Sequence, residues 1–284
     1  MVTREDPITV DAVERHLTTR WLGRPCHSFG SVSSTMDVAR RIADGGAPIG
    51  TLVVADAQTA GRGRHGRRWN SSPGLGLWFS LILSDEISPG VLAHVLACGV
   101  AEGVERYGVH GVAVKWPNDV MVAETDTLDV ASDGQPSTWP DKAVRSARKI
   151  AGILVERSSA NRRSVVGIGI NVGHSIDDFP SDLVDVATSV ALCTERSVSR
   201  AELLGAVLSA VERRLDAAQS RSDADGLAAE WRERSLVLGR LVRVERGEDQ
   251  LVGRAVEIRA DGSLVVASES GTHVIGSGSI SFVC

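Results

Sequence analysis

Nine residues, Gly61-Arg62-Gly63-Arg64-His65-Gly66-Arg67-Arg68-Trp69, decide which α/β fold this chain adopts. They satisfy the Gly-x-Gly-x-x-Gly spacing of a dinucleotide-binding turn, and the short β-branched run at 51–55 predicts a strand before them. That motif requires a helix directly afterwards. Residues 70–74 (Asn-Ser-Ser-Pro-Gly) instead predict a turn, and the apolar run at 75–83 predicts a second strand. The glycines therefore lie in a strand-to-strand loop, which argues against a Rossmann fold.

The same loop is not a Walker A motif, because Arg67-Arg68 stand where Lys-Ser/Thr is required. Its four arginines form a basic cluster in a chain whose formal net charge is −5. Glycine lets the backbone approach a ligand closely, and arginine offers a planar fork of donors that matches phosphate and carboxylate. We therefore expect the loop to wrap an anionic nucleotide or an acyl-phosphate.

Length and composition predict one large and one small globular domain. At 284 residues the chain exceeds the usual domain size, and its 43% apolar and 24% charged residues are ordinary for a soluble protein. No run approaches the ~20 apolar residues of a membrane span, and residues 1–7 lack the apolar core of a signal peptide. Cys26, Cys98, Cys193 and Cys284 are dispersed, which predicts reduced thiols in a cytoplasmic protein. The histidines form no ligand pair for a metal.

Apolar periodicity predicts alternating helices and strands before a change of texture at Gly239. Helices are expected at 10–21, 36–44, 89–107, 199–218 and 223–234, and strands at 51–57, 75–83, 112–115, 119–122, 150–156 and 164–171. After Gly239, short alternating strands separated by Asp/Gly turns predict a small β-barrel. We therefore expect an α/β (α+β) domain over 1–236, with a mixed sheet flanked by helices, and a barrel domain over 237–284. Residues 124–147 predict an exposed insertion.

Three further segments carry residue types suited to ligand chemistry. The block Lys115-Trp116-Pro117-Asn118-Asp119 ends a strand in a turn, which on its own is equally a decorated turn. Lys149 heads an apolar strand, so its amine points either at one specific partner or at bulk solvent. Gly167 and Gly169, inside a strand, mark close approach by either a ligand or a packed helix.

Five segments, in this order along the chain, resemble biotin protein ligases: Ser34-Thr35 and residues 58–69, 115–119, 148–156 and 167–172. The resemblance covers about residues 28–284 and is to the monofunctional type without an N-terminal DNA-binding domain. It implies a class II synthetase-like catalytic domain and an SH3-like β-barrel. It also implies that biotin and ATP give biotinyl-5′-AMP and pyrophosphate. The biotinyl group then passes to a lysine in the biotin carboxyl carrier domain of an acyl-CoA carboxylase.

The resemblance further implies roles for particular residues. Those implied to be catalytic are Arg64, Lys149, Lys115 and Asp119. Those implied to bind biotin are Ser34, Thr35, Gln58, Gly61, Arg62, Gly63, Arg64 and Lys149. Those implied to bind ATP or the adenylate are Arg64, Arg67, Trp69, Asn118 and Asn171. Mg²⁺ is expected to accompany ATP, without a cluster of side-chain ligands of its own.

Physical chemistry agrees with these implied roles. A carboxylate and ATP repel one another until cations neutralise both, and Arg64, Arg67, Lys149 and a bound Mg²⁺ are suited to that task. The product is a mixed anhydride that water destroys, so we expect the glycine-arginine loop to act as a lid over it. Asp119 is a candidate to orient the acceptor amine or to accept its proton.

Two departures from the family pattern and two alternative functions stay open at this point. Met36 stands where the family usually has Asn, so one polar contact near biotin is missing or replaced. The segment between the two lysine blocks is longer than usual and is either inert or in contact with the carrier protein. The alternatives are a biotin-sensing transcriptional regulator, for which no DNA-binding domain is evident, and a lipoate or octanoate ligase, whose pocket needs an apolar tunnel. We expect no nucleic-acid partner and no membrane partner.

Overall fold

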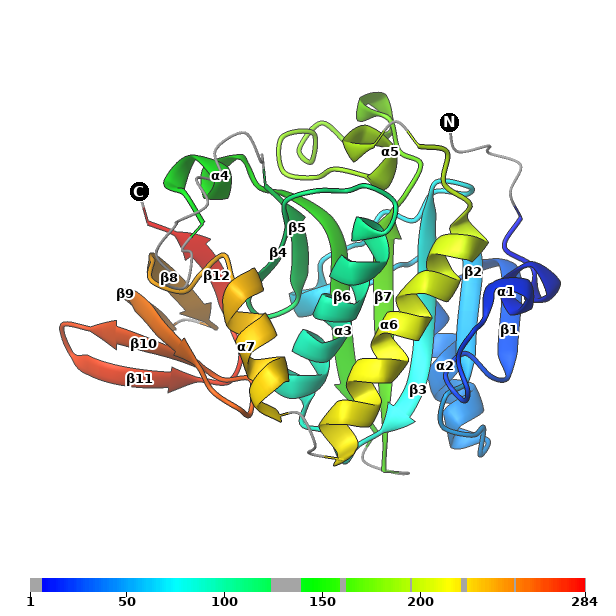
Figure 1. Ribbon diagram of the computed structural model, residues 1–284, viewed down its shortest axis with the longest axis horizontal. Coiled ribbons are helices and arrows are strands. Elements are labelled where there is room, and N and C mark those ends of the chain that lie inside the picture. Colours follow the sequence, from blue (N-terminus) through cyan, green and yellow to red (C-terminus); the bar gives the residue numbers. More distant parts are fainter. Residues whose placement is uncertain are drawn as a thin grey trace.

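Two sheets organise the chain in the computed structural model, which describes residues 7–123, 139–158, 162–194, 196–220, 224–247 and 249–283 (Figure 1). The large sheet has seven strands in the order β1-β2-β3-β7-β6-β5-β4, and the C-terminal sheet has five in the order β11-β10-β9-β8-β12. The strands of the large sheet are β1 (Cys26–Val32), β2 (Leu52–Gln58), β3 (Gly76–Ser84), β4 (Val112–Lys115), β5 (Asp119–Val122), β6 (Arg148–Arg157) and β7 (Arg163–Asn171). Those of the C-terminal sheet are β8 (Leu241–Arg246), β9 (Asp249–Ile258), β10 (Leu264–Ser268), β11 (Gly271–Ile275) and β12 (Ser279–Phe282).

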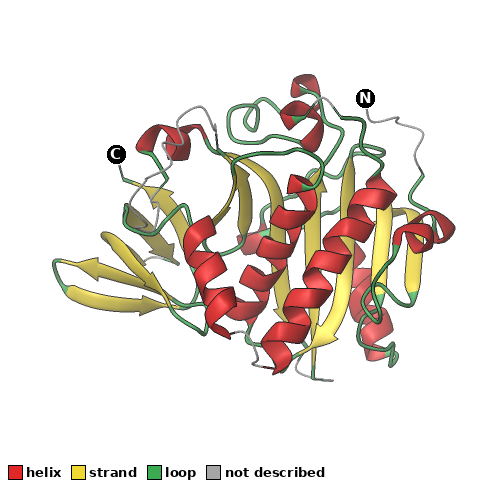
Figure 2. Cartoon of the chain, viewed as in Figure 1, coloured by secondary structure: helices red, strands yellow, loops and turns green. Residues whose placement is uncertain are grey.

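Helices cover both faces of the large sheet. They are α1 (Val10–His16), α2 (Thr35–Asp44), α3 (Pro89–Glu105), α4 (Asp141–Ser146), α5 (Val190–Cys193), α6 (Arg200–Ser220) and α7 (Ala224–Arg234). Helices α3, α6 and α7 lie side by side across the face that is turned to the viewer in Figures 1 and 2, and α2 lies behind the sheet. No helix in the described parts of the chain is long and apolar enough to cross a membrane.

Strand β3 lies in the interior of the large sheet, and its sequence is apolar on both faces. Eight of its nine residues, Gly76 to Leu83, are buried, as expected for a strand covered on both sides. It pairs antiparallel with β2 and with β7, whereas β1 and β2 are parallel. The expected mixed sheet flanked by helices is therefore confirmed, and so is the strand-to-strand position of the glycine-arginine loop.

Glycines on α3 let it approach α6 closely. A Cβ atom built on Gly99 would lie 2.5 Å from Cγ2 of Val211, and one on Gly103 would lie 2.3 Å from Cγ2 of Val207. These two glycines serve helix-on-helix packing, since neither carries a side chain that would hold the helices apart.

Helix α2 packs on the opposite face and begins at the functional cavity described below. Met36 and Val38 are buried in a small core with Val53, Ile82 and Val165. Ser34 is the residue before the first helical turn, with an extended backbone, so the helix starts where the sequence predicts. The C-terminal sheet follows its own alternating pattern, with Val242 and Val244 buried on one side of β8. A β-rich C-terminal region is thus confirmed, while a boundary between 236 and 237 stays a prediction.

Two elements near the N-terminus differ from expectation. The helix expected at 10–21 ends at His16, because Leu17 already has an extended backbone. Leu17 and Leu22 are buried through a turn rather than through a helix, so their spacing imitates a helical period. Strand β1 was not anticipated, since its sequence Cys-His-Ser-Phe-Gly-Ser-Val shows neither apolar alternation nor an apolar run.

The expectation that residues 124–147 form an exposed insertion is wrong for the last part of this segment. Residues 124–138 lie outside the described residues. Helix α4 follows them. Its residue Ala143 is buried, and its residue Val144 is buried against Ala113, Met121 and Leu236. The Asp- and Ser-rich composition of the whole segment hid this short apolar stretch, which is sufficient to anchor one helical turn on the sheet edge.

Candidate active site

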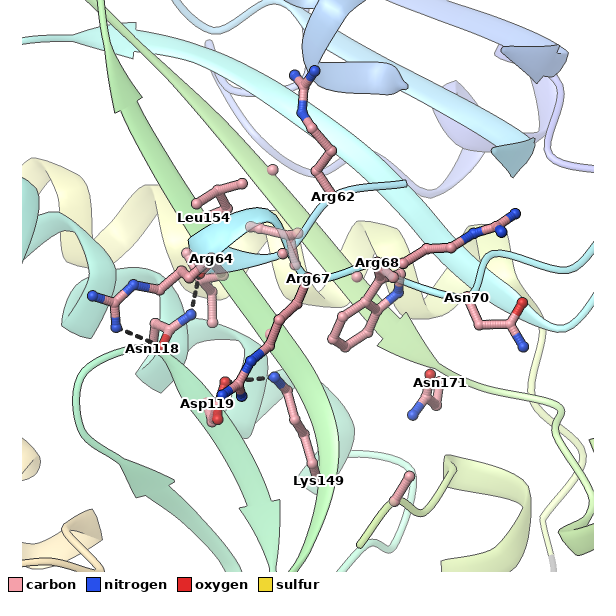
Figure 3. A pocket seen from close by; sticks show the side chains of 18 of the residues that line it. Arg62, Arg64, Arg67, Arg68, Asn70, Asn118, Asp119, Lys149, Leu154 and Asn171 are labelled. Atoms are coloured by element: carbon pink, nitrogen blue, oxygen red, sulfur yellow. Dashed lines mark hydrogen bonds and ion pairs between the residues drawn. The ribbon is translucent and has the colours of Figure 1, made fainter. Parts of the chain in front are cut away.

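A cavity of about 410 Å³ lies where the glycine-arginine loop crosses the face of the large sheet that carries α2 (Figure 3). Five parts of the chain line it: the start of α2, the loop itself, the segment Lys115–Asp119, the strands β6 and β7, and a loop at 174–187. Residues 278–280 of the C-terminal sheet add a further wall. Every site residue anticipated from the sequence lines this cavity except Gly61.

One end of the cavity is a network of uncharged polar groups. The Gln58 Oε1 atom accepts hydrogen bonds from the Thr35 backbone N–H (2.9 Å) and hydroxyl (3.1 Å). Gln58 Nε2 donates to Ser71 Oγ at 2.9 Å, and Ser80 Oγ donates to Thr35 Oγ1 at 2.8 Å. Ser34, 1% exposed, lies beside this network. The network fixes the Gln58 amide, so the cavity presents oriented donors and acceptors at this end.

The glycine-arginine loop is a small hairpin that closes on itself. Gly63 N–H donates to the Arg67 carbonyl at 2.7 Å, and Trp69 N–H donates to the Gly61 carbonyl at 2.9 Å. A Cβ atom on Gly61 would lie 2.6 Å from the Trp69 carbonyl oxygen, so Gly61 allows the neck of the hairpin to close. This contact with its own loop is the role that the structure gives Gly61, in place of a position on the cavity wall. His65, at φ 57°, makes the tip.

The loop arginines divide into two pairs. Figure 3 shows Arg64 and Arg67 reaching toward Asn118, Asp119 and Lys149, whereas Arg62 and Arg68 point away from them. The Arg62 guanidinium is bound to the Asp37 carboxylate on α2 at 2.6 Å, and that of Arg68 donates to the Thr59 carbonyl at 3.3 Å. Arg62 was expected among the biotin-binding residues, and its charged end is committed to α2 instead.

Arg64 joins three parts of the site. Its Nη1 atom donates to the Gly278 carbonyl of the C-terminal sheet at 3.0 Å and to Asn118 Oδ1 at 3.4 Å. Asn118 Nδ2 in turn donates to the Ile153 carbonyl at 2.6 Å. Burial lowers the pKa of the Arg64 guanidinium, and the Asp119 carboxylate opposes that change. The arginine keeps its charge, because its pKa begins far above neutrality.

Lys149 points into the cavity at a specific partner, which answers the question left open by its sequence. Its Nζ atom lies 2.6 Å from Asp119 Oδ1 and 4.9 Å from the ring centre of Trp69. The backbone is held as well, since Lys149 N–H donates to the Val186 carbonyl (2.8 Å) and its carbonyl accepts from Thr188 N–H (2.9 Å). The rigid backbone and the two side-chain partners, Asp119 and Trp69, together hold the Lys149 amine in its position.

Lys115 lies at the wall made with the C-terminal sheet. Its Nζ atom is 5.2 Å from the ring centre of Phe282. Burial lowers the pKa of the Lys115 amine, Asp119 opposes that change, and the charges of Lys149 and Arg67 reinforce it. The cavity therefore concentrates positive charge around the Asp119 carboxylate.

The glycines of β6 and β7 form a floor for larger side chains. A Cβ atom on Gly169 would lie 2.6 Å from Nε1 of Trp69, and one on Gly152 would lie 3.0 Å from Cζ3 of the same ring. Gly167 lies beneath Met36, whose sulfur would be 2.7 Å from a Cβ atom there. Gly167 therefore serves helix packing, one of the two alternatives left open for these strand glycines, whereas Gly169 makes room for the loop tryptophan, which neither alternative named.

The other end of the cavity is aromatic and apolar, and sequence reasoning missed most of it. His174 stacks on Phe179 with ring centres 4.9 Å apart, and burial lowers the pKa of His174 to about 4. The Nδ1 atom of His174 and the Nε1 atom of Trp69 are buried and have no hydrogen-bond partner within the described residues. Asn171 Nδ2 donates to the Thr188 carbonyl at 3.0 Å. Residues 174–187 are mostly irregular in structure, so no periodicity could mark them as a cavity wall.

Taken together, these features define a site for two anionic groups and a flat ring. Polar groups stand at one end, cationic side chains in the middle and aromatic rings at the other end. Such an arrangement suits an enzyme that activates a carboxylate with a nucleotide, because the cations reduce the repulsion between the two reactants.

Comparison with known proteins identifies the family. The profile of the Biotin/lipoate A/B protein ligase family matches residues 28–174, and that of the Biotin protein ligase C terminal domain matches residues 237–283. The chain therefore belongs to the biotin/lipoate protein ligase family, and the resemblance seen in the sequence is confirmed.

Individual relatives agree with that assignment. The chain is 30% identical to the biotin–(acetyl-CoA-carboxylase) ligase of Mycobacterium tuberculosis over 249 residues, which cover 87% of this chain and 85% of that protein. It is 29% identical to the bifunctional ligase/repressor BirA of Bacillus spizizenii over 286 residues, or 99% of this chain and 81% of that protein. The structure of the biotin protein ligase from Aquifex aeolicus in complex with biotin and ATP superposes with a TM-score of 0.72 at 29% identity, covering 91% of this chain and 98% of that one.

Proposed function

We propose that this protein is an ATP-dependent ligase that joins biotin to AMP and transfers the biotinyl group to a lysine of a biotin carboxyl carrier domain. The observation that carries the proposal is the order of groups along the cavity. The Thr35–Gln58 network suits a ureido ring, Lys149 and Arg64 suit a carboxylate and a phosphate, and the rings of Trp69 and Phe179 suit adenine.

In the first step, a carboxylate oxygen of biotin attacks the α-phosphorus of ATP and pyrophosphate leaves. Lys149 is proposed to exchange Asp119 for the biotin carboxylate, since the two carboxylates compete for one ammonium group. Arg64 and Arg67 are proposed to stabilise the charge on the phosphate oxygens. The hairpin that carries these arginines crosses the cavity, so it also shields the mixed anhydride from water.

In the second step, the amine of the acceptor lysine attacks the carbonyl carbon of biotinyl-AMP and AMP leaves. The amine must first lose a proton, because its ordinary pKa is about 10.4. Asp119 is proposed to orient that amine, since it is the carboxylate among the described residues that line the cavity. With Lys149 bound to substrate, one oxygen of Asp119 becomes available for this contact.

Mg²⁺ is proposed to enter with ATP and to offset phosphate charge. No group of three or more His, Cys, Asp or Glu side chains suited to a metal occurs among the described residues. The ion would therefore be held mainly by phosphate oxygens and water, as Mg²⁺ prefers, with Asp119 as the protein ligand within the cavity.

The carrier domain of an acyl-CoA carboxylase is the proposed acceptor, and the cytoplasm the proposed location. The acceptor follows from the printed name of the mycobacterial relative, a biotin–(acetyl-CoA-carboxylase) ligase. Lipoate and octanoate are the competing acids, because the matching family includes lipoate ligases. The match to a biotin ligase C-terminal domain and the polar Thr35–Gln58 end both favour biotin.

Pyrophosphate release tests the proposal. Purified protein would be mixed with ATP, Mg²⁺ and biotin, lipoate or octanoate in separate reactions. We expect pyrophosphate release in the reaction that contains biotin and in neither of the other two. Release only in the reactions with lipoate or octanoate would instead assign the protein to the lipoate branch of the family. Since a relative is named a bifunctional ligase/repressor, a gel shift with promoter DNA at low salt serves as the parallel test for DNA binding.

A further inference from the structure

Two glycines from distant parts of the chain meet backbone to backbone. Gly90 is the second residue of α3, and Gly262 lies in the turn between β9 and β10. A Cβ atom on Gly262 would lie 2.4 Å from the carbonyl carbon of Gly90, and one on Gly90 would lie 2.7 Å from the Asp261 carbonyl oxygen. Gly262 also has φ +85°, a conformation that disfavours other residues. Because both clashes are with backbone atoms, no side-chain rotation relieves them.

Two hydrogen bonds fasten this contact. Trp116 Nε1 donates to the Gly262 carbonyl at 3.0 Å, and Ser88 Oγ donates to the Asp261 carbonyl at 3.2 Å. Trp116 is 2% exposed, so its indole N–H is removed from water and needs that one acceptor. We call the contact of Ser88, Gly90 and Trp116 with Asp261 and Gly262 the seam.

The seam is connected to the cavity on both of its sides. Trp116 itself lines the cavity, together with Lys115 and Asn118 of the same segment, so the seam and that wall share one residue. On the side of the C-terminal sheet, Gly278 and Ser279 line the cavity, and the Gly278 carbonyl accepts from Arg64. A shift of the C-terminal sheet would therefore remove a cavity wall and one partner of Arg64 together.

We propose that the seam is a positioning device that fixes the C-terminal sheet beside the cationic part of the cavity, with Trp116 and Gly262 as the positioning residues. This inference rests on the proposed function and deepens it. The seam should affect the binding of ATP and of biotin differently, because the Thr35–Gln58 network is formed by α2, β2, β3 and the loop between these strands. It includes no residue of the C-terminal sheet. Loosening the seam should weaken ATP binding and adenylate retention, and spare biotin binding.

The test compares two seam variants with a matched control. Gly262→Ala adds a methyl group that collides with Gly90. Trp116→Phe removes the indole N–H together with part of the ring system, and keeps an aromatic side chain. Gly247→Ala is the control, since Gly247 is also a turn glycine of the C-terminal sheet with positive φ (+62°), but a Cβ atom there meets nothing within 4 Å. The readouts are the Kd for ATP and for biotin by calorimetry, and the rate at which biotinyl-adenylate escapes in single-turnover mixtures.

Both seam variants are expected to raise the Kd for ATP about tenfold, the factor that corresponds to about 1.4 kcal/mol, and to speed adenylate escape. The Kd for biotin should stay within about twofold of wild type in every variant, a change smaller than that expected for one lost hydrogen bond. The proposal would be overturned if Gly262→Ala and Gly247→Ala had the same Kd for ATP. It would also be overturned if a seam variant weakened the binding of ATP and of biotin equally. If Gly262→Ala does not fold, an unchanged Kd for ATP in Trp116→Phe overturns it.

Failure of the seam and failure of the proposed function give different results. The Kd for ATP is measured without a reaction. It therefore tests the proposed role of the seam even if the wild-type protein forms no adenylate from biotin. If the wild-type protein forms biotinyl-adenylate and the seam variants bind ATP as tightly as wild type, the proposal about the seam is overturned and the proposed function is not.

Discussion

Replacing Lys149 by Gln removes one positive charge and keeps a hydrogen-bond donor on a side chain that is one bond shorter. The backbone at this position is held by Val186 and Thr188, so the substitution acts at the amine and not on the strand. In the structure that amine contacts Asp119 at 2.6 Å and lies 4.9 Å from the Trp69 ring centre. The change therefore tests whether the charge at this one position activates the carboxylate.

The expected magnitude follows from the surroundings. Opposite unit charges at about 4 Å attract by about 4 kcal/mol at an effective dielectric constant of about 20. Arg64 and Arg67 remain and offset part of the loss, so we expect a cost close to that of one oxyanion donor, about 2.7–4 kcal/mol or about 100- to 1,000-fold. The Lys149 and Asp119 side chains are 30% and 27% exposed, so the pair is partly buried and its loss also lowers stability, which is measured separately from the rate.

The assay is single-turnover formation of biotinyl-adenylate at saturating biotin and ATP. Lys149→Arg keeps the charge but has a longer, planar donor, so it should recover only part of the rate. Thermal unfolding of each variant provides the control for folding. Adenylate formation in Lys149→Gln within about threefold of wild type, far less than one donor contributes, would mean that the amine is a structural partner of Asp119 and nothing more.

Other perturbations separate the ends of the cavity. Arg64→Ala should slow adenylate formation or retention about 100-fold with little loss of stability, and wild-type half-reactions would refute its role. Gln58→Ala should raise the Kd for biotin about tenfold by calorimetry and leave that for ATP unchanged, since its contacts lie at the uncharged end. Gly169→Ala should displace Trp69 and raise the KM for ATP about tenfold, and an unchanged KM would show that the ring tolerates the methyl group. Burial raises the pKa of Glu102, but three arginine hydrogen bonds lower it to about 2, so its stabilisation is complete above about pH 4.5 and disappears as the pH falls toward 2. Glu102→Gln should therefore lower the free energy of unfolding by about 1–3 kcal/mol at pH 7, with a difference from wild type that shrinks in acid, and a constant difference would contradict this.

Turn residues and apolar runs in the sequence predicted where strands and loops lie when neighbouring residues alone determine them. The turn after Trp69 excluded a helix, and the structure has β3 there. Lys149, Arg64 and Asn118 could be named from the sequence because their motifs resemble those of biotin protein ligases. Local chemistry alone left Lys149 and the block of Asn118 open between a ligand role and a structural one. Their convergence on one cavity required the pairing of β5 with β6, which no local signal encodes.

Other features depend on tertiary contacts that the sequence does not display. His174 and Phe179 lie in an irregular segment, so neither periodicity nor turn chemistry identifies them. Gly61 and Arg62 share a motif with Arg64, yet one closes the hairpin neck and the other binds Asp37. Composition alone failed at α4, where two buried residues outweigh the acidic and polar residues around them.

The central claim is that this cavity activates biotin for transfer to protein. The most direct measurement is the intact mass of a biotin carboxyl carrier domain after incubation with the purified protein, ATP, Mg²⁺ and biotin, followed by mapping of the modified residue. We expect the carrier domain to gain one biotinyl group on a single lysine. This gain should depend on ATP and should be strongly reduced with Lys149→Gln. An unmodified carrier domain with active wild-type controls, or modification only when lipoate or octanoate replaces biotin, would contradict it.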